Sequence, residues 1–168
     1  EETLKGAAIL LIAWRRRREF DGVIDGIVYA GMAGAGFAFS ENILYLGRAF
    51  DEAGSAGLTE VFFVRCLMGP FAHPLFTAAT GIGIGLAVAV ARSAGARFVY
   101  GAAGLLVAMT LHAIWNLSAS LGAYMQVYVA FQMPVFGVFL VMLVVLRQHE
   151  QGLVRRYLSQ YADAGWLT

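Results

Sequence analysis

The sequence predicts an all-α protein, a polytopic bundle of about five transmembrane helices. Hydrophobic residues make up 60% of the chain and charged residues only 14%, against about 45–50% and about 25% in soluble domains. The apolar residues also form long blocks at 61–91, 98–121 and 125–146. Each block can cross a bilayer, which requires about 20 apolar residues. A soluble chain of 168 residues has too little interior to bury so many such blocks.

Apolar runs and the breakers between them divide the chain into elements. The range 1–14 is interpreted as the remnant of a first span, and because no signal region precedes it we expect a longer protein whose earlier spans are missing. Further helices are predicted at 23–48, 60–91, 97–122 and 124–147. The helix at 60–91 is too long for one straight span, so we expect Pro70 and Pro74 to kink it, since each removes a backbone donor.

Neither a repeat nor a low-complexity linker divides these helices, so 1–147 is predicted to be one membrane-embedded domain, truncated at its N-terminus. The tail, 148–168, repeats apolar residues at helical spacing opposite Arg155 and Arg156. This pattern predicts an amphipathic helix lying on the cytoplasmic membrane surface.

The basic residues predict the orientation of the spans. Arginines follow the first span, flank the loop at 92–97 and follow the last span, whereas 51–59 and 118–123 contain neither Lys nor Arg. By the positive-inside bias, the arginine-bearing loops and the C-terminus are cytoplasmic and the acidic segment 51–59 is external. We therefore expect a multi-pass protein of the plasma membrane, in contact with the lipid bilayer. The net charge of +1 indicates no nucleic-acid partner, and the sequence indicates no particular oligomeric state.

Polar residues interrupt the apolar runs at positions where each charge costs about 2.5–3.5 kcal/mol. Such residues need to pair with one another or to face a water-filled cavity. We predict that Glu1 and Lys5, which are four residues apart, form an ion pair. With the rise per residue of an α-helix, the depth of these polar residues along their separate spans is similar, and it places them in one layer in the outer half of the bilayer. The set is Glu1, Glu2, Lys5, Glu41, His73, His112 and Asn116.

Spacing within the helices supports a shared site. His112 and Asn116 are four residues apart and lie on one helix face. Glu41 continues a stripe of small residues, so we expect it to point into the bundle, with an ion pair to Arg48 at the external surface as the alternative. Arg65, near the external end of its run, is interpreted as a structural or interface charge.

Two kinds of chemistry fit these residues. In a glutamic mechanism, Glu1 or Glu2 activates a water as general base and no cofactor is needed. In a metal mechanism, Glu41, His73 and His112 hold Zn²⁺ with a water in the open position. The sequence contains no HExxH motif, so both stay open, and we favour the metal classification.

Four motifs in order resemble the PrsW family of intramembrane proteases. They are EETLK at 1–5, GFAFSEN at 36–42, His73 after Gly69-Pro70, and HAIWN at 112–116. The family is related to the type II CAAX prenyl endopeptidases and to the scaffold subunit of gamma-secretase, and the resemblance extends to about residue 117. It implies a bacterial protease that cleaves a membrane-anchored protein, typically an anti-sigma factor, near the external membrane face.

The CAAX enzymes further imply roles for individual residues. By this resemblance, Glu1 and Glu2 activate the water, and His112 and Asn116 stabilise the oxyanion. Glu41 stands where those enzymes carry a histidine, so their mechanism does not transfer directly.

Two other functions use similar residues. Buried Glu and His side chains serve as proton relays in proton-coupled transporters, but here they gather in one layer instead of crossing both leaflets. A non-catalytic membrane scaffold is the other alternative, and the complete pair of Glu1 and Glu2 argues against it.

Overall fold

The computed structural model describes residues 1–163, and every regular element in this range is a helix. The chain divides into two compact units, Glu1–Tyr124 and Met125–Thr168, which are described separately. The α-helices are α1 (Glu2–Arg15), α2 (Val23–Phe62), α3 (Ala72–Ala89), α4 (Ala94–Ser120), α5 (Tyr124–Val127) and α6 (Met133–Asp163). Two π-helical segments, η1 (Phe63–Met68) and η2 (Tyr128–Gln132), adjoin α2 and α6.

The expected count of about five helices is not confirmed. By length and composition, three helical segments among the described residues can cross a membrane, namely Val23–Ala89, Ala94–Ser120 and Tyr124–Leu158. With α1 they make four. The segment 51–59, expected to be a loop, lies within the bounds of α2, but Gly54 in this segment has a non-helical conformation that separates α2 into two helical arms.

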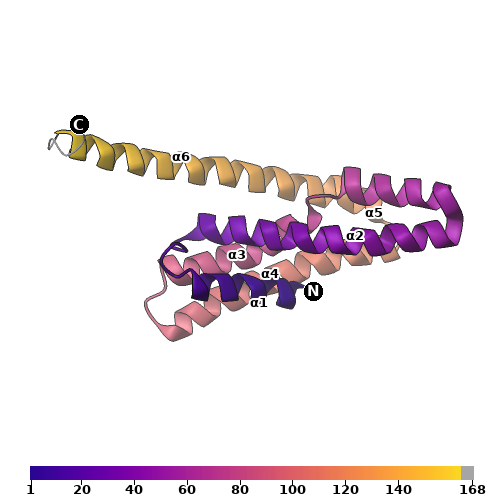
Figure 1. Ribbon diagram of the computed structural model, residues 1–168, viewed down its shortest axis with the longest axis horizontal. Coiled ribbons are helices and arrows are strands. Elements are labelled where there is room, and N and C mark those ends of the chain that lie inside the picture. The colour runs from indigo at the N-terminus through magenta and orange to yellow at the C-terminus, as the bar shows by residue number, and fades with distance from the viewer. Residues whose placement is uncertain (164–168) are drawn as a thin grey trace. The chain divides into compact units, whose positions relative to one another are not determined.

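The chain reverses at Gly54, where a kink separates the two helical arms of α2. Gly54 has φ 63° and ψ −147°, a conformation that glycine adopts readily. Beyond it, Gly57 packs so closely that an added Cβ would lie 2.6 Å from the carbonyl oxygen of Ala49. The returning arm of α2 is visible in Figure 1.

The predicted kink near Pro70 is confirmed, and it is a complete break. The π-helix η1 ends at Met68, and α3 begins at Ala72. Pro74 does not kink the chain, because it lies in the first turn of α3, where a backbone donor has no helical partner to lose. The break places His73 at the beginning of a helix inside the bundle.

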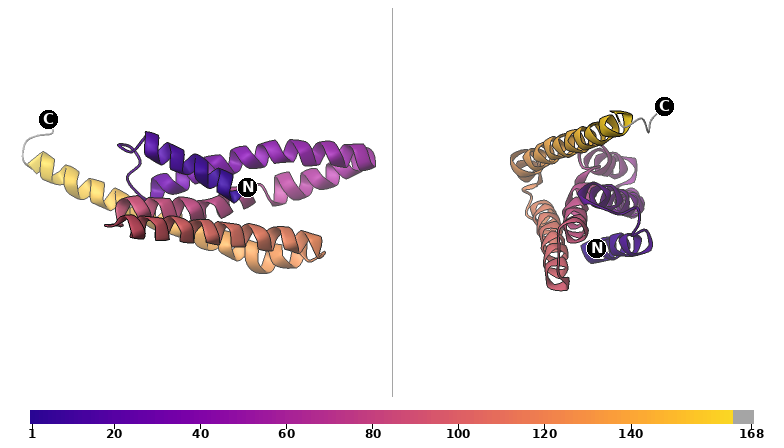
Figure 2. Two further views of the ribbon diagram at one scale, coloured as in Figure 1. Left: turned by 90° about the horizontal axis from the view of Figure 1, so that it is seen from below. Right: turned by 90° about the vertical axis from the view of Figure 1, so that its left-hand side faces the viewer.

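Helix α3 is the centre of the first unit. It packs against α2 on one side and α4 on the other, and α1 contacts all three (Figure 1). Figure 2 shows the same arrangement from two further directions. Glycines allow the close approach that membrane helices use: a Cβ on Gly81 would lie 2.1 Å from the carbonyl oxygen of Gly26. A Cβ on Gly34 would lie 2.7 Å from the backbone nitrogen of Pro74, directly beside His73.

The second unit consists mainly of α6, a helix of 31 residues. Its apolar side chains are largely exposed, including Val138 and Val141, as expected for a helix that faces lipid. The helix continues without interruption into the tail predicted for the membrane surface, as far as Asp163. The end of that tail, 164–168, lies outside the described residues.

Candidate active site

The polar residues singled out in the sequence converge within the first unit. Glu1 and Glu2 lie at the start of α1, Glu41 lies on α2, His73 lies in the first turn of α3, and His112 lies on α4. Hydrogen bonds and ion pairs connect all five. Four helices therefore supply one polar cluster, as the depth of these residues along their spans predicts.

Glu2 is the most deeply held carboxylate of the cluster. Its side chain is 2% exposed, and its Oε1 accepts hydrogen bonds from Lys5 Nζ at 2.7 Å and from His112 Nδ1 at 3.0 Å. Oε2 accepts a third from Thr77 Oγ1 at 3.1 Å. Three donors satisfy a charge that would be costly if left unpaired. Thr77 was not expected in the site, although it lies four residues after His73 and so shares its helix face.

Lys5 links the two carboxylates of α1 to His73. The predicted ion pair with Glu1 is confirmed at 3.6 Å, and Nζ lies 3.0 Å from Nδ1 of His73 and 4.0 Å from the ring centre of Phe37. An ammonium group only donates, so Nδ1 of His73 accepts. The proton of His73 then sits on Nε2, which lies 3.0 Å from Oε2 of Glu41 and donates to it. His73 is thereby held as the neutral imidazole.

Glu41 points into the bundle as expected, but its charged partner is Arg65. The Glu41 carboxylate forms an ion pair with Nη2 of Arg65 and a hydrogen bond with His73, so the alternative that it pairs with Arg48 is wrong. Nε of Arg65 donates to Oδ1 of Asn42 at 2.7 Å. The guanidinium also lies 3.9 Å from the ring centre of Tyr45.

Arg65 therefore pairs with a residue of the cluster, whereas the sequence suggested only a structural or interface charge. An arginine inside an apolar run requires a counter-charge, and Glu41 is the carboxylate that the neighbouring helix provides. That signal was present in the sequence. The reversal of α2 at Gly54, which brings Arg65 back alongside Glu41, was not evident.

His112 is fixed on three sides. Its Nδ1 donates to Glu2, and the ring stacks on Phe76 with a centroid distance of 5.6 Å and an interplanar angle of 30°. The edge of one imidazole meets the face of the other between His73 and His112, with centroids 5.0 Å apart. Nε2 of His112 lies 3.4 Å from Oε2 of Glu1, whose side chain is 38% exposed. Glu2 therefore orients a histidine whose second nitrogen faces the accessible carboxylate.

Within the described part of the chain, donor atoms of Glu1, His73 and His112 lie within 4.8 Å of one another. Two imidazole nitrogens and one carboxylate oxygen are a donor set that suits a divalent cation such as Zn²⁺. Glu41, expected from the sequence as a ligand, is not in this group and is engaged by Arg65 and His73. The donor set fits a cation, which would lie beside the ammonium group of Lys5.

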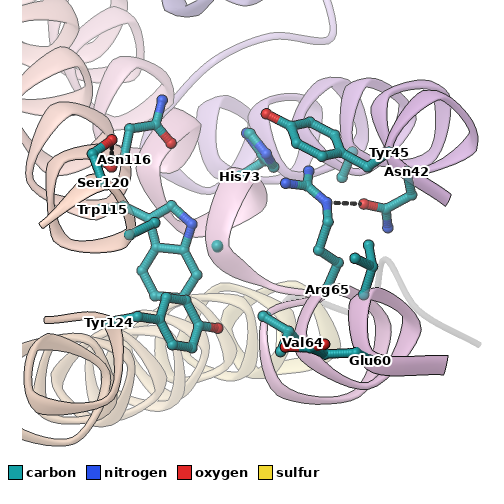
Figure 3. Close-up of a pocket in the computed structure, with 15 residues that line it drawn as sticks. Asn42, Tyr45, Glu60, Val64, Arg65, His73, Trp115, Asn116, Ser120 and Tyr124 are labelled. Carbon is teal, nitrogen blue, oxygen red and sulfur yellow. Dashed lines mark hydrogen bonds between the residues drawn. The ribbon is translucent and has the colours of Figure 1, made fainter. Parts of the chain in front are cut away.

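Two cavities adjoin the cluster. The larger has a volume of about 640 Å³ and is bordered by His73, Arg65 and Asn116 (Figure 3). The smaller, of about 240 Å³, is bordered by Glu1, Glu2, His112 and Asn116. Asn116 borders both, so the polar cluster can be approached from two sides.

Comparison with known proteins gives one family. A family model described as PrsW family intramembrane metalloprotease matches residues 1–146. No curated protein matches the chain, and no solved structure matches it. The match includes every residue of the polar cluster described above and covers most of the chain.

Proposed function

Because this chain belongs to the PrsW family of intramembrane metalloproteases and is therefore a membrane-embedded peptidase, we propose that its proteolytic centre consists of Glu1, Glu2, His73, His112 and Asn116. The observation that carries this proposal is the placement of His112. One ring nitrogen bonds to buried Glu2, and the other faces accessible Glu1 beside a cavity. A carboxylate that orients a histidine is a recurring arrangement in hydrolytic sites.

Peptide hydrolysis requires an activated water, and Glu1 is the carboxylate best placed to provide it. Its Oε2 faces His112 and Lys5, while no hydrogen bond among the described residues involves its Oε1. Glu1 lines the smaller cavity, so a water can reach it. Oε1 then takes a proton as the water oxygen bonds to the peptide carbonyl carbon, and this proton passes to the leaving nitrogen as the C–N bond breaks.

Glu2 has a different role, because three donors already occupy its oxygens. Its oxygens are therefore committed to donors within the protein and are less available to activate a water. Glu2 instead holds His112 in one orientation and balances the charge of Lys5. Asn116, through its side-chain amide, is placed to donate a hydrogen bond to the developing oxyanion, and His112 can do so through Nε2 when both of its ring nitrogens carry a proton, a role that the family resemblance also implies.

We propose that the metal of this family is Zn²⁺ here, held by Glu1, His73 and His112. With the cation bound, Glu1 and His112 would act as ligands, and their roles as general base and oxyanion donor belong to the metal-free alternative. When bound, the cation would supply a Lewis acid that polarises the peptide carbonyl and acidifies a water. In this arrangement Glu2 is the outer carboxylate that orients the ligand His112. His73 can accept this role only if its Nδ1 or Nε2 exchanges a present partner, Lys5 or Glu41, for the cation.

We propose that the substrate is a membrane-anchored protein, anti-sigma-factor-like, cleaved near the external membrane face. The four arginines at 15–18 follow the C-terminal end of α1, and the polar cluster lies at the other end, about 20 Å away along the helix. Positive-inside orientation then places the arginine end and the C-terminal tail in the cytoplasm and the cluster in the outer half of the bilayer.

The test is cleavage of a single-span substrate by the full-length protein in lipid vesicles. Glu2→Gln and His112→Ala are each expected to abolish cleavage while membrane insertion is retained. The matched control is Glu52→Gln, which changes an exposed carboxylate outside the cluster and is expected to leave cleavage unchanged. Full cleavage by Glu2→Gln and His112→Ala would reject the proteolytic centre, and uphill solute flux through the same vesicles would indicate a transporter.

A further inference from the structure

The larger cavity is a built site beside the proposed proteolytic centre. Its volume of about 640 Å³ lies in the range of about 300–1,000 Å³ that is typical of ligand sites. Helix α2 and its returning arm form one wall, the start of α3 forms the floor and α4 forms the opposite wall. In Figure 3, the guanidinium of Arg65 reaches toward His73, with Trp115 and Asn116 across the cavity.

The lining combines an apolar, aromatic wall with one strong donor. Trp115 and Tyr124 meet edge to face with their ring centres 4.9 Å apart. On the opposite side, the guanidinium of Arg65 lies over the ring of Tyr45. Alanines occupy several lining positions, among them Ala119, so the cavity owes part of its volume to small side chains.

Arg65 has donor capacity that the protein does not use. Its bonds to Asn42 and Glu41 employ Nε and Nη2, and no hydrogen bond among the described residues involves Nη1. A guanidinium carries five N–H groups, and two of them are on Nη1. Because the charge of Arg65 is already balanced by Glu41, Nη1 is best suited to a neutral acceptor such as a main-chain carbonyl.

A membrane-spanning substrate presents such an acceptor. Cleavage requires that its helix be opened at the cut site, and each opened residue leaves a carbonyl that must find a donor inside the membrane. Arg65 offers that donor within the same cavity that His73 lines. The aromatic wall provides a place for an apolar side chain of the opened segment.

We propose that this cavity binds one residue of the opened substrate segment next to the scissile bond. A bulky apolar side chain occupies the space between Trp115, Tyr124 and Ala119, and Nη1 of Arg65 donates to a substrate main-chain carbonyl. This inference rests on the proposed function and adds to it a preference for a large apolar residue at one substrate position. Arg65 is thereby a substrate-binding residue.

The first test is a change of specificity. Single-span substrates carrying Ala, Leu or Phe at each position around the cut are incubated with wild type and with Ala119→Phe. Wild type is expected to prefer Leu or Phe at one position, and Ala119→Phe to prefer Ala there, with at least a tenfold reversal of the kcat/KM ratio. Leu117→Phe, which places an aromatic ring on the same helix at an exposed position outside the cavity lining, is the matched control and is expected to keep the wild-type preference.

The second test concerns the donor. Arg65→Lys retains the positive charge beside Glu41 but loses the planar fork of donors. We expect its KM to rise on the order of tenfold, as for loss of a charged hydrogen bond, with a smaller change in kcat. An unchanged KM for Arg65→Lys would overturn the role of Nη1. Identical preferences in wild type and Ala119→Phe, or the absence of any size preference in wild type, would overturn the cavity assignment.

Photo-cross-linking separates this inference from the proteolytic proposal. A benzophenone amino acid replaces Ser120, at the cavity edge, in the His112→Ala background, and the same probe replaces exposed Leu117 as control. Cross-linking of substrate from position 120 and not from 117 supports the cavity even if the catalytic assignment fails. Cleavage by the wild type with no cross-link from position 120 overturns the cavity and leaves the catalytic assignment intact.

Discussion

Oε1 of Glu2 and Nδ1 of His112 lie 3.0 Å apart, across the interface between α1 and α4. This bond joins two segments separated by more than a hundred residues, and it lies where both side chains are almost completely buried. It fixes which nitrogen of His112 faces the cavity. The position of α1 is therefore required for the geometry of α4.

Glu2→Gln is expected to lower both activity and stability. The substitution removes the charge that balances Lys5 in a buried setting, and breaking a buried pair costs about 3–5 kcal/mol. Cleavage and thermal unfolding in detergent are measured together. The double variant Glu2→Gln/Lys5→Met, which removes both charges, is expected to recover stability without recovering cleavage. Recovery of cleavage in the double variant would contradict the orienting role of Glu2.

Glu1→Gln is expected to separate activity from stability. The Glu1 side chain is 38% exposed, and its distances to Lys5 and His112 are longer than those of Glu2. Loss of its charge should therefore abolish cleavage, because Gln cannot take a proton from water, while the midpoint of thermal unfolding stays close to that of the wild type. A variant that unfolds as easily as Glu2→Gln would show that Glu1 is a structural residue.

Much of the site follows from the sequence, because intramembrane charges constrain one another strongly. Glu2, Glu41, His73 and His112 each stand in or beside an apolar run, and the energetic cost of burial predicts that they meet. Which residue pairs with which does not follow. That choice depends on the reversal of α2 at Gly54, which returns Arg65 to Glu41 and removes the expected external loop.

The helix boundaries were harder to predict than the helices themselves. The segment 51–59 contains acidic and small residues that are common both in loops and in exposed helices, so composition alone does not distinguish them. The break at Pro70 was foreseeable, since proline lacks a backbone donor. Pro74 does not kink α3, because α3 begins at Ala72 and Pro74 lies in its first turn. This starting residue is known only once the break is located.

The ion pair between Glu41 and Arg65 predicts a double-mutant cycle. Arg65→Met leaves Glu41 with His73 as its remaining partner, and both charges are mostly buried, so we expect a loss of up to about 3–5 kcal/mol. Glu41→Gln alone is expected to be destabilising for the same reason. Combining the two should cost less than the sum of the single changes. Additive effects on the unfolding midpoint would show that the pair contributes no coupling.

Metal content provides an independent prediction. Purified active protein is expected to contain one divalent cation per chain and to lose cleavage when treated with a chelator, with recovery on addition of Zn²⁺. His73→Ala and His112→Ala are expected to lower the bound metal, and Glu2→Gln to weaken metal affinity about 10–100-fold as an outer partner of His112. Metal content is measured by elemental analysis, without reference to activity. Cleavage that persists in metal-free protein would leave Glu1 as the base of a glutamic mechanism.

The packing of α2 on α3 predicts that a single methyl group can disturb the site from outside it. A Cβ on Gly34 would lie 2.7 Å from the nitrogen of Pro74 and 2.8 Å from the carbonyl oxygen of His73, and backbone atoms cannot move aside as a flexible side chain can. Gly34→Ala must therefore push α2 away from the start of α3, where His73 bonds to Lys5 and Glu41. We expect reduced cleavage and a lower unfolding midpoint. Gly31→Ala, on the same helix with nothing within 4 Å of the added methyl, is the matched control and should retain both properties. Equal behaviour of the two variants would mean that the contact between α2 and α3 does not position His73.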